Sequence, residues 1–201
     1  PIEMLAIGSN QNDILPRTVA TGAYEMRGVA ATSSPSMDIQ ISSNFERYLF
    51  EASGRDADLV ARQMQMLAQS GRFELSAEQQ SSLRQDFCAA AASEDDVAAT
   101  IRETLRASGY LVEPHTACGV HAARTALAAN VSADTARVVL STAHPAKFPD
   151  AIEPITGARP ALPPLLATLM TDQERYPVLG NDLKEVETFV EKVSRAAGAH
   201  A

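Results

Sequence analysis

IEMLAIGSNQNDILPRTVA, residues 2–20, contains the pattern from which the fold of this chain can be predicted. The apolar run at 2–8 has the length of a buried strand, and polar residues that suit a helix cap close it. A helical pattern then begins at Ile14, and the same order of apolar run, polar turn and helix returns at 28–52. This alternation predicts an α/β fold with an open, mostly parallel sheet flanked by helices.

Residues 56–108 interrupt the alternation, and their pattern predicts helices alone. Ser76 with Gln79 and Ser93 with Asp96 have the three-residue spacing of capping boxes, in which two side chains satisfy exposed N–H groups at a helix start. The expected helices are 56–70, 76–91 and 94–107. We therefore expect a helical insert that packs on the sheet.

The strand pattern returns after residue 109. YLVEP at 110–114 and RVVLST at 137–142 predict two further strands, with a helix from Thr116 to Asn130 between them. The wholly apolar VVL run is typical of a central parallel strand. The expected parts are sheet and helix at 1–55, the helical insert at 56–108, a second sheet part at 109–157, and carboxyl-terminal helices at 158–201, the last from Asp182 to about Ala197.

Composition excludes several classes of function. The 201 residues include 17 Lys plus Arg against 25 Asp plus Glu, a net charge of −8, which disfavours binding to nucleic acids or to a membrane surface. With 45% hydrophobic residues the chain can form a core, and no uncharged apolar stretch reaches the roughly 18–20 residues of a membrane span. Cys88 and Cys118 form no CxxC motif, which favours reduced thiols and a cytoplasmic location. The start at Pro1, inside an apolar run, suggests a processed product or a segment of a longer chain.

The polar loops after the expected strands are candidates for a ligand cleft, because ligands of open α/β sheets gather beyond the carboxyl ends of strands. These loops read SNQND, TSSPSMD, EPHT and STAHPAK in chain order. One such loop alone is more often a helix cap, but four together indicate a cleft. Asp38 and Glu113 are its candidate acids or bases, although neither has a second carboxylate beside it in a motif.

The sequence lacks the motifs of several other kinds of functional site. The chain has no GxGxxG, GxxxxGK[ST], HExxH or GxSxG motif. His115 and His121 are six residues apart and His144 is distant from both, so polar or capping roles are favoured and no metal site is expected. Lys147 is either a surface lysine, the commoner case, or an amine placed for a Schiff base. Arg47 is either a salt-bridge partner on a helix or an anion clamp.

Long motifs in this sequence point to one enzyme family. They are SPSMDIQISSNFERYLFEASGRD at 34–56, GYLVEPHTACGVHAA at 109–123 and LSTAHPAKFPDAI at 140–152, with SNQNDIL at 9–15 and FELSAEQQSSLRQDF at 73–87. Together they closely resemble threonine synthase of the longer bacterial and fungal type. The resemblance covers nearly the whole chain and is to the carboxyl-terminal part of that enzyme.

The resemblance implies a fold, a cofactor and a reaction. Threonine synthases have the tryptophan synthase β-like fold, fold type II of the enzymes that use pyridoxal 5'-phosphate (PLP). They convert O-phospho-L-homoserine and water into L-threonine and phosphate, with the cofactor ring as the electron sink. By resemblance, Thr142 places its hydroxyl at the pyridine nitrogen and Glu113 lies near the ring. Asn10, Ser36 and Asp38 match positions that line the cleft.

The resemblance also implies what lies outside these residues. In the family, the Schiff-base lysine lies in an SFKD-like motif, and a Gly/Asn-rich loop holds the cofactor phosphate. Both lie before the equivalent of Pro1. Lys147 lies in a different motif, TAHPAKF. We therefore expect no catalytic residue in this segment, no activity of the segment alone, and self-association through its incomplete sheet. The alternatives are a segment of a related PLP-dependent phospho-lyase and a non-catalytic domain that keeps the fold.

Overall fold

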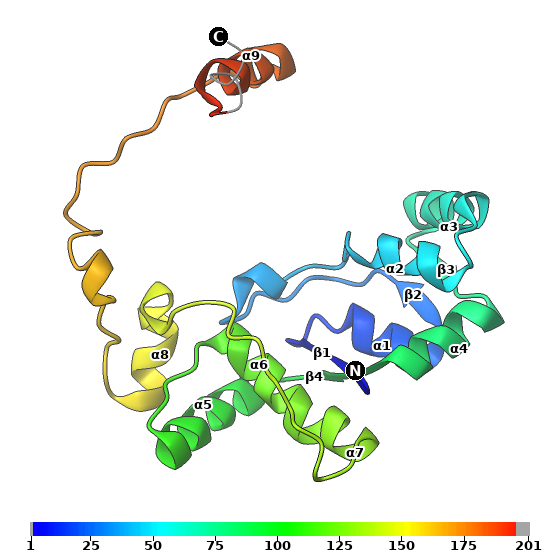
Figure 1. Ribbon diagram of the computed structural model, residues 1–201, viewed down its shortest axis with the longest axis horizontal. Helices are drawn as coiled ribbons and strands as arrows, with labels where there is room; N and C mark the ends of the chain where they lie inside the picture. The colour runs from blue at the N-terminus through cyan, green and yellow to red at the C-terminus, as the bar shows by residue number, and fades with distance from the viewer. Residues whose placement is uncertain (1, 196–201) are drawn as a thin grey trace. The chain divides into compact units, whose positions relative to one another are not determined.

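The computed structural model describes residues 2–195, and the chain divides into two compact units between Ala161 and Leu162 (Figure 1). The strands are β1 (Leu5–Ser9), β2 (Ala23–Glu25), β3 (Arg72–Glu74) and β4 (Phe87–Ala91). The α-helices of the first unit are α1 (Ile14–Thr21), α2 (Phe45–Ala52), α3 (Ala57–Ser70), α4 (Ala77–Asp86), α5 (Glu94–Ser108), α6 (Pro114–Ala122), α7 (Ala128–Asn130) and α8 (Pro149–Thr156). Shorter helical turns are η1 (Pro35–Met37), the π-helical η2 (Ala123–Leu127) and η3 (Pro145–Lys147).

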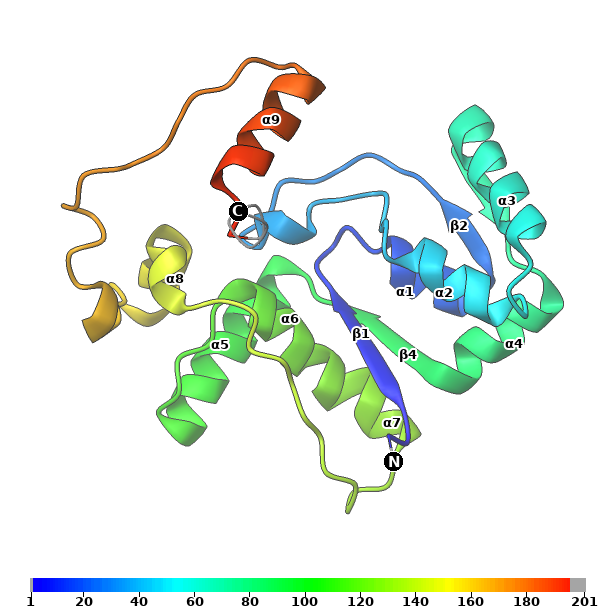
Figure 2. The same cartoon turned by 45° about the horizontal axis from the view of Figure 1, so that its top comes forward.

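Two small sheets organise the first unit. β1 and β4 run parallel, with Leu5 opposite Phe87 and Ser9 opposite Ala91. Helix α1 packs against β4 and α6 packs against β1 (Figure 2). β2 and β3 form an antiparallel pair. The expected α/β class is confirmed, and the parallel part of the sheet consists of β1 and β4.

The prediction of helices alone over 56–108 is wrong for two stretches. Helix α4 ends at Asp86, and FCAAA continues as β4 instead of as the end of a helix at 76–91. Alanine favours helix locally, but the ladder with β1 and the burial of Cys88 outweigh that preference. The short strand β3 also lies within this range.

Three expected strands are also absent from the structure. Residues 28–32, 110–114 and 137–142 contain no strand. A strand needs a neighbour for its backbone hydrogen bonds, and apolar composition cannot supply one. Among residues 2–195, β1 pairs only with β4, and the segment at 137–142 forms no ladder with the other edge of β1.

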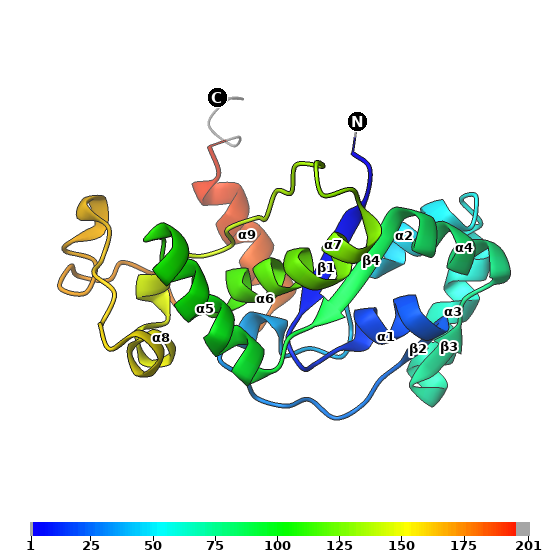
Figure 3. The ribbon, with the colours of Figure 1, turned by 90° about the horizontal axis from the view of Figure 1, so that it is seen from below.

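Helix α6 lies very close to β1. A Cβ atom added to Gly8 would lie 2.7 Å from the carbonyl oxygen of Cys118 and 3.0 Å from the Cα atom of Gly119. Only glycine at position 8 therefore allows this contact between strand and helix. Helix α6 continues through η2 into α7 on the same side of the sheet (Figure 3).

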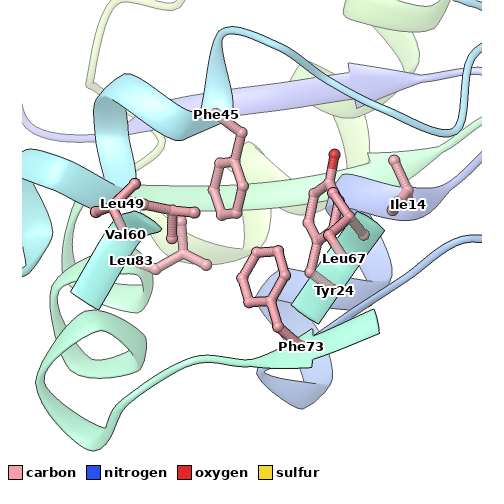
Figure 4. Close-up of a cluster of buried hydrophobic side chains, with 8 residues drawn as sticks. All are labelled: Ile14, Tyr24, Phe45, Leu49, Val60, Leu67, Phe73 and Leu83. Carbon is pink, nitrogen blue, oxygen red and sulfur yellow. The ribbon is translucent and has the colours of Figure 1, made fainter. Parts of the chain in front are cut away.

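The largest buried cluster lies between the small sheet β2–β3 and the helices around it (Figure 4). Its members are Ile14, Tyr24, Phe45, Leu49, Val60, Leu67, Phe73 and Leu83. The ring of Tyr24 stacks on both Phe45 and Phe73, at centroid distances of 5.4 and 5.0 Å. Next to this cluster, buried Gln63 and Gln79 exchange amide hydrogen bonds of 2.7 and 3.1 Å, and Gln79 also completes the expected capping box with Ser76.

A second cluster supports the candidate site. It joins α5, α6 and α8 through Ala92, Val97, Ile101, Val112, Ala117, Cys118 and Ile152. These side chains hold the start of α6 in place. The helix start at Ser93 has the capping box that its sequence predicts.

The second unit contains η4 (Pro164–Leu166) and α9 (Leu183–Val193). Helix α9 begins as expected, with the Asp182 carboxylate accepting a hydrogen bond from the Glu185 amide at 2.9 Å. Its expected end near Ala197 lies outside the described residues. No helix in the described range has the length and apolar character to cross a membrane. The four-part division of the chain stays a prediction.

Candidate functional site

Glu113 is the centre of a cluster of polar groups at the start of α6. Its side chain is fully buried and caps the helix. One carboxylate oxygen accepts from the Thr116 amide and hydroxyl, both at 2.6 Å, and from the Thr142 hydroxyl at 3.2 Å. The other accepts from the His115 amide at 2.8 Å and from its ring Nδ1 at 2.7 Å. We call Glu113, His115, Thr116 and Thr142 the Glu113 cluster.

This cluster keeps a buried carboxylate in its charged form. Burial raises the pKa of Glu113, but hydrogen bonds from Thr116 and His115 outweigh burial and leave the pKa below its usual value. An ionised carboxylate can only accept hydrogen bonds. Each group that contacts Glu113 must therefore donate to it.

His115 links the cluster to the loop that precedes η1. Its Nδ1 donates to Glu113, and its Nε2 accepts from the Ser36 amide at 3.2 Å. Because Nε2 uses its lone pair, the ring is the neutral tautomer with its hydrogen on Nδ1. The ring also packs on Phe148, with 4.7 Å between the centroids.

Thr142 is attached to the start of α6 at two points. Its amide donates to the Thr116 hydroxyl at 3.1 Å, and its own hydroxyl donates to Glu113. Both contacts link Thr142 to residues 26 and 29 positions earlier in the chain. The fold thus brings Thr142 next to Glu113.

A groove of about 920 Å³ opens beside the cluster. Its walls come from β1, from α6 with η2, and from the segment at 131–140, which contains no helix or strand. Ser36, His115 and Thr142 supply polar groups to a lining that is mainly apolar. The exposed Ser36 hydroxyl has no hydrogen-bond partner in the described part of the chain, so it is free to contact a ligand.

Asn10 and Asp38 belong to a different network, which closes the loop after β1. The Asn10 amide donates to the Asp38 carboxylate at 2.7 Å and to the Thr32 hydroxyl at 2.8 Å, and Asn10 is fully buried. Burial raises the pKa of Asp38, while hydrogen bonds from Thr32 and Asn10 outweigh it and hold the pKa below its usual value. Of the three expected cleft residues, Ser36 lines the groove, and Asn10 and Asp38 contact each other instead.

The remaining candidates, Lys147, Arg47 and His144, contact other residues of this chain. Exposed Lys147 lies with its Nζ 5.5 Å from the ring centroid of Phe148. The Arg47 guanidinium donates to Asn44 at 2.5 Å, and the ring of His144 caps η3. No group of three or more His, Cys, Asp or Glu side chains within residues 2–195 is arranged to hold a metal ion.

Sequence reasoning missed the contacts of His115 and Thr116. A sequence signal for part of this arrangement exists, because an acidic residue directly before a proline indicates the N-cap and first position of a helix. EPHT at 113–116 has that pattern and predicts a carboxylate that faces the amides of the first turn. The contacts to Ser36 and Thr142 have no such local signal.

Comparisons with known proteins identify the family. A family model described as "Threonine synthase, C-terminal" matches residues 116–190. Threonine synthase of Pseudomonas aeruginosa is 41% identical over 191 residues, which are 94% of this chain and 40% of that protein. The crystal structure of PLP-bound threonine synthase from Brucella melitensis is 54% identical and superposes with a TM-score of 0.84, over 97% of this chain and 41% of that one. This chain belongs to the threonine synthase family.

The expected family is thus confirmed, and the match is to the carboxyl-terminal region. Yeast threonine synthase gives a TM-score of 0.79 at 33% identity, over 96% of this chain and 42% of that one. The chain spans about two fifths of the length of these threonine synthases. Its two small sheets and their helices correspond to part of the threonine synthase fold, which is fold type II.

Proposed function

We propose that this chain is the carboxyl-terminal part of a PLP-dependent threonine synthase, and that the whole enzyme converts O-phospho-L-homoserine and water into L-threonine and phosphate. The observation that supports this most strongly is the 54% identity to the PLP-bound Brucella melitensis enzyme over 97% of the chain. The chain matches 41% of that enzyme, and in this proposal it supplies one wall of the active site.

The residues at the groove suit a planar aromatic cofactor. Ser36 and Thr142 offer hydroxyls, His115 offers a neutral ring, and the remaining lining is mostly apolar. Thr142 would hold the ring nitrogen of PLP, and Glu113 would hold Thr142 in place. When bound, PLP supplies the electron sink that the reaction needs. The apolar walls limit access of water to the ring.

We also propose that the protein acts in the reducing cytoplasm. Cys88 and Cys118 are both free and buried. Burial raises the pKa of the Cys118 thiol to about 11, so the thiol stays protonated and unreactive. Two inert thiols that form no disulfide support a cytoplasmic protein.

The test uses a chimera in which this chain replaces the matching region of the Brucella melitensis enzyme. We expect the chimera to bind PLP, release phosphate from O-phospho-L-homoserine and form threonine. We expect the 201-residue chain alone to show no cofactor absorbance and no phosphate release, because the Schiff-base lysine lies elsewhere in the family. The unmodified Brucella melitensis enzyme is the control.

The products separate the alternatives. A ketoacid in place of threonine, with phosphate released, would indicate a phospho-lyase. A folded chimera that binds PLP and turns over no substrate would indicate a non-catalytic domain. Phosphate release by the chain alone would show that the segment is complete.

A further inference from the structure

A single side chain ties the turn η1 to the start of α6. Backbone hydrogen bonds of 2.9 and 3.1 Å, from the Met37 and Asp38 amides, close the turn on itself. The Ser36 amide, which precedes them in the chain, donates instead to Nε2 of His115 at 3.2 Å. The side chain of His115 is only 8% exposed, so the acceptor is held firmly. Because this bond joins residues 79 positions apart, it sets where η1 lies against α6.

The end of the turn is held by other groups. The Asp38 carboxylate accepts from the Asn10 amide and from the Thr32 hydroxyl, both at 2.7 Å. These contacts hold Asp38 and leave Ser36 alone. Within the described residues, the Ser36 hydroxyl has no hydrogen-bond partner and lines the groove, and its amide donates to His115. The contact with His115 therefore sets the position of the Ser36 hydroxyl in the groove.

The ring of His115 can accept from Ser36 in only one protonation state. Its other nitrogen, Nδ1, lies 2.7 Å from the Glu113 carboxylate. Burial raises the pKa of Glu113, but hydrogen bonds from Thr116 and His115 hold the pKa below its usual value of 4.5, so the carboxylate has no hydrogen to give. Nδ1 therefore carries a hydrogen in the neutral ring and in the charged ring. Any further proton is added at Nε2, the atom that accepts from Ser36.

We propose that His115 is a positioning residue for the Ser36 hydroxyl, and that it holds η1 at the groove only while its Nε2 is unprotonated. Once Nε2 carries a hydrogen, two N–H donors face each other and the hydrogen bond to Ser36 is lost. The turn then separates from α6, while the contacts of Asp38 keep the rest of the loop in place. The consequence for substrate binding rests on the proposed function.

Charged groups from three elements surround His115. Glu113 at the start of α6 and Asp38 after η1 are carboxylates, which favour the added proton. Lys147 of η3 disfavours it, since its Nζ lies 5.5 Å from the ring of Phe148, which packs on His115. Hydrogen bonds hold the pKa of each carboxylate below its usual value, so both keep their charge between pH 5 and 8. Histidine gains its proton in this range.

Hydrogen exchange of the 201-residue chain tests the hold on η1. The exchange of the Ser36 amide is resolved by fragmentation mass spectrometry at pH 8 and pH 5 and corrected for the intrinsic effect of pH. We expect its protection to fall about fivefold at pH 5, the effect of losing one hydrogen bond. Unchanged protection of the α6 amides shows that the chain stays folded.

Two variants of His115 separate positioning from packing. His115→Gln offers an amide oxygen near the position of Nε2 and takes no proton, so the protection of Ser36 should be the same at both pH values. His115→Phe keeps an aromatic ring against Phe148 and has no acceptor, so protection should be low at both. A fall at pH 5 in His115→Gln equal to that of the parent would overturn the proposal.

The other histidines supply matched controls. His121→Gln changes the second histidine of α6, which interacts with Asp96, and His144→Asn keeps an oxygen that can cap η3. Both variants should show the fall in Ser36 protection that the parent shows. Loss of the response in either variant, or equal protection of the parent at both pH values, would show that His115 does not control the turn.

Kinetics of the chimera described above test the effect on the site. We expect the ratio of the KM of the parent to that of His115→Gln, for O-phospho-L-homoserine, to rise about fivefold from pH 8 to pH 5, with the ratio of their kcat values nearly constant. Comparison with His115→Gln cancels the titration of the substrate itself.

The outcomes distinguish this inference from the proposed function. An active chimera in which the KM ratio does not change with pH would overturn the role of His115 at the site and leave the threonine synthase assignment standing. A folded chimera that forms no threonine, while the chain keeps its pH-dependent protection of Ser36, would overturn the proposed function and the effect on substrate, and would leave the hold of His115 on Ser36 intact.

Discussion

At the scale of single residues, the candidate site depends on one buried acid. Glu113 receives all its hydrogen bonds from residues 115, 116 and 142, and none of these bonds would form with the same strength to a neutral carboxyl group. The folded state therefore favours the charged form of Glu113 more than the unfolded state does. This difference links the stability of the protein to pH.

We expect the free energy of unfolding to fall in acid. Because the folded pKa of Glu113 is below its usual value of 4.5, the unfolded chain binds a proton first, so stability is complete above about pH 4.5 and is lost as pH drops through the folded pKa. Glu113→Gln should be less stable at pH 7 and lose less stability in acid. Urea unfolding at pH 7 and pH 4 measures both effects.

The control for this experiment is Glu103→Gln, which alters an exposed ion pair and should keep the acid loss of the parent. Asp38, whose pKa is also lowered, should account for part of the loss that remains in Glu113→Gln. An equal acid loss in Glu113→Gln and in the parent would contradict the link to Glu113.

At the scale of elements, the contact between β1 and α6 sets the position of the site. β1 ends at Ser9, and α6 begins at Pro114, directly after Glu113. Their close approach at Gly8 fixes how α6 lies across the sheet. The same contact forms one wall of the groove, to which both Gly8 and Gly119 contribute.

Gly8→Ala should destabilise the fold by ~2 kcal/mol, because the new methyl group would overlap backbone atoms of α6 that cannot move separately. Thermal or urea unfolding of the chain measures this loss. Gly28→Ala is the matched control, since a Cβ atom there has open space, and it should change stability little. Equal stability of the two variants would show that α6 shifts at little cost.

At the scale of the whole molecule, apolar surface remains uncovered. Val138 and Leu140 are 83% and 78% exposed beside the groove, and β1 has one edge without a strand partner in the described part of the chain. An open edge with adjacent apolar side chains tends to pair with another chain. This surface is consistent with a chain that spans two fifths of its relatives.

We predict that the isolated chain self-associates through this surface, with a mass that rises with concentration in size-exclusion chromatography with light scattering. Val138→Asp should shift the population towards monomer. Val178→Asp, at a valine of similar exposure that does not line the groove, should not. A parent chain that stays monomeric at all concentrations would argue against this surface as an interface.

The sequence by itself determined the features that depend on neighbouring residues. Motifs such as those at 34–56 and 109–123 identify the family, and the capping patterns at Ser76, Ser93 and Asp182 mark true helix starts. The alternation that begins at 2–20 indicates the α/β class. Caps and periodicity are local, because their hydrogen bonds join residues three or four positions apart.

Only the tertiary structure decided which distant segments meet. β4 is a strand because β1, more than 80 positions earlier, pairs with it, and 137–142 is not a strand because nothing described in the chain pairs with it. The contacts of Glu113 with Thr142 and of His115 with Ser36 join residues 29 and 79 positions apart. Such pairings depend on how the chain packs, and no local pattern of residues specifies them.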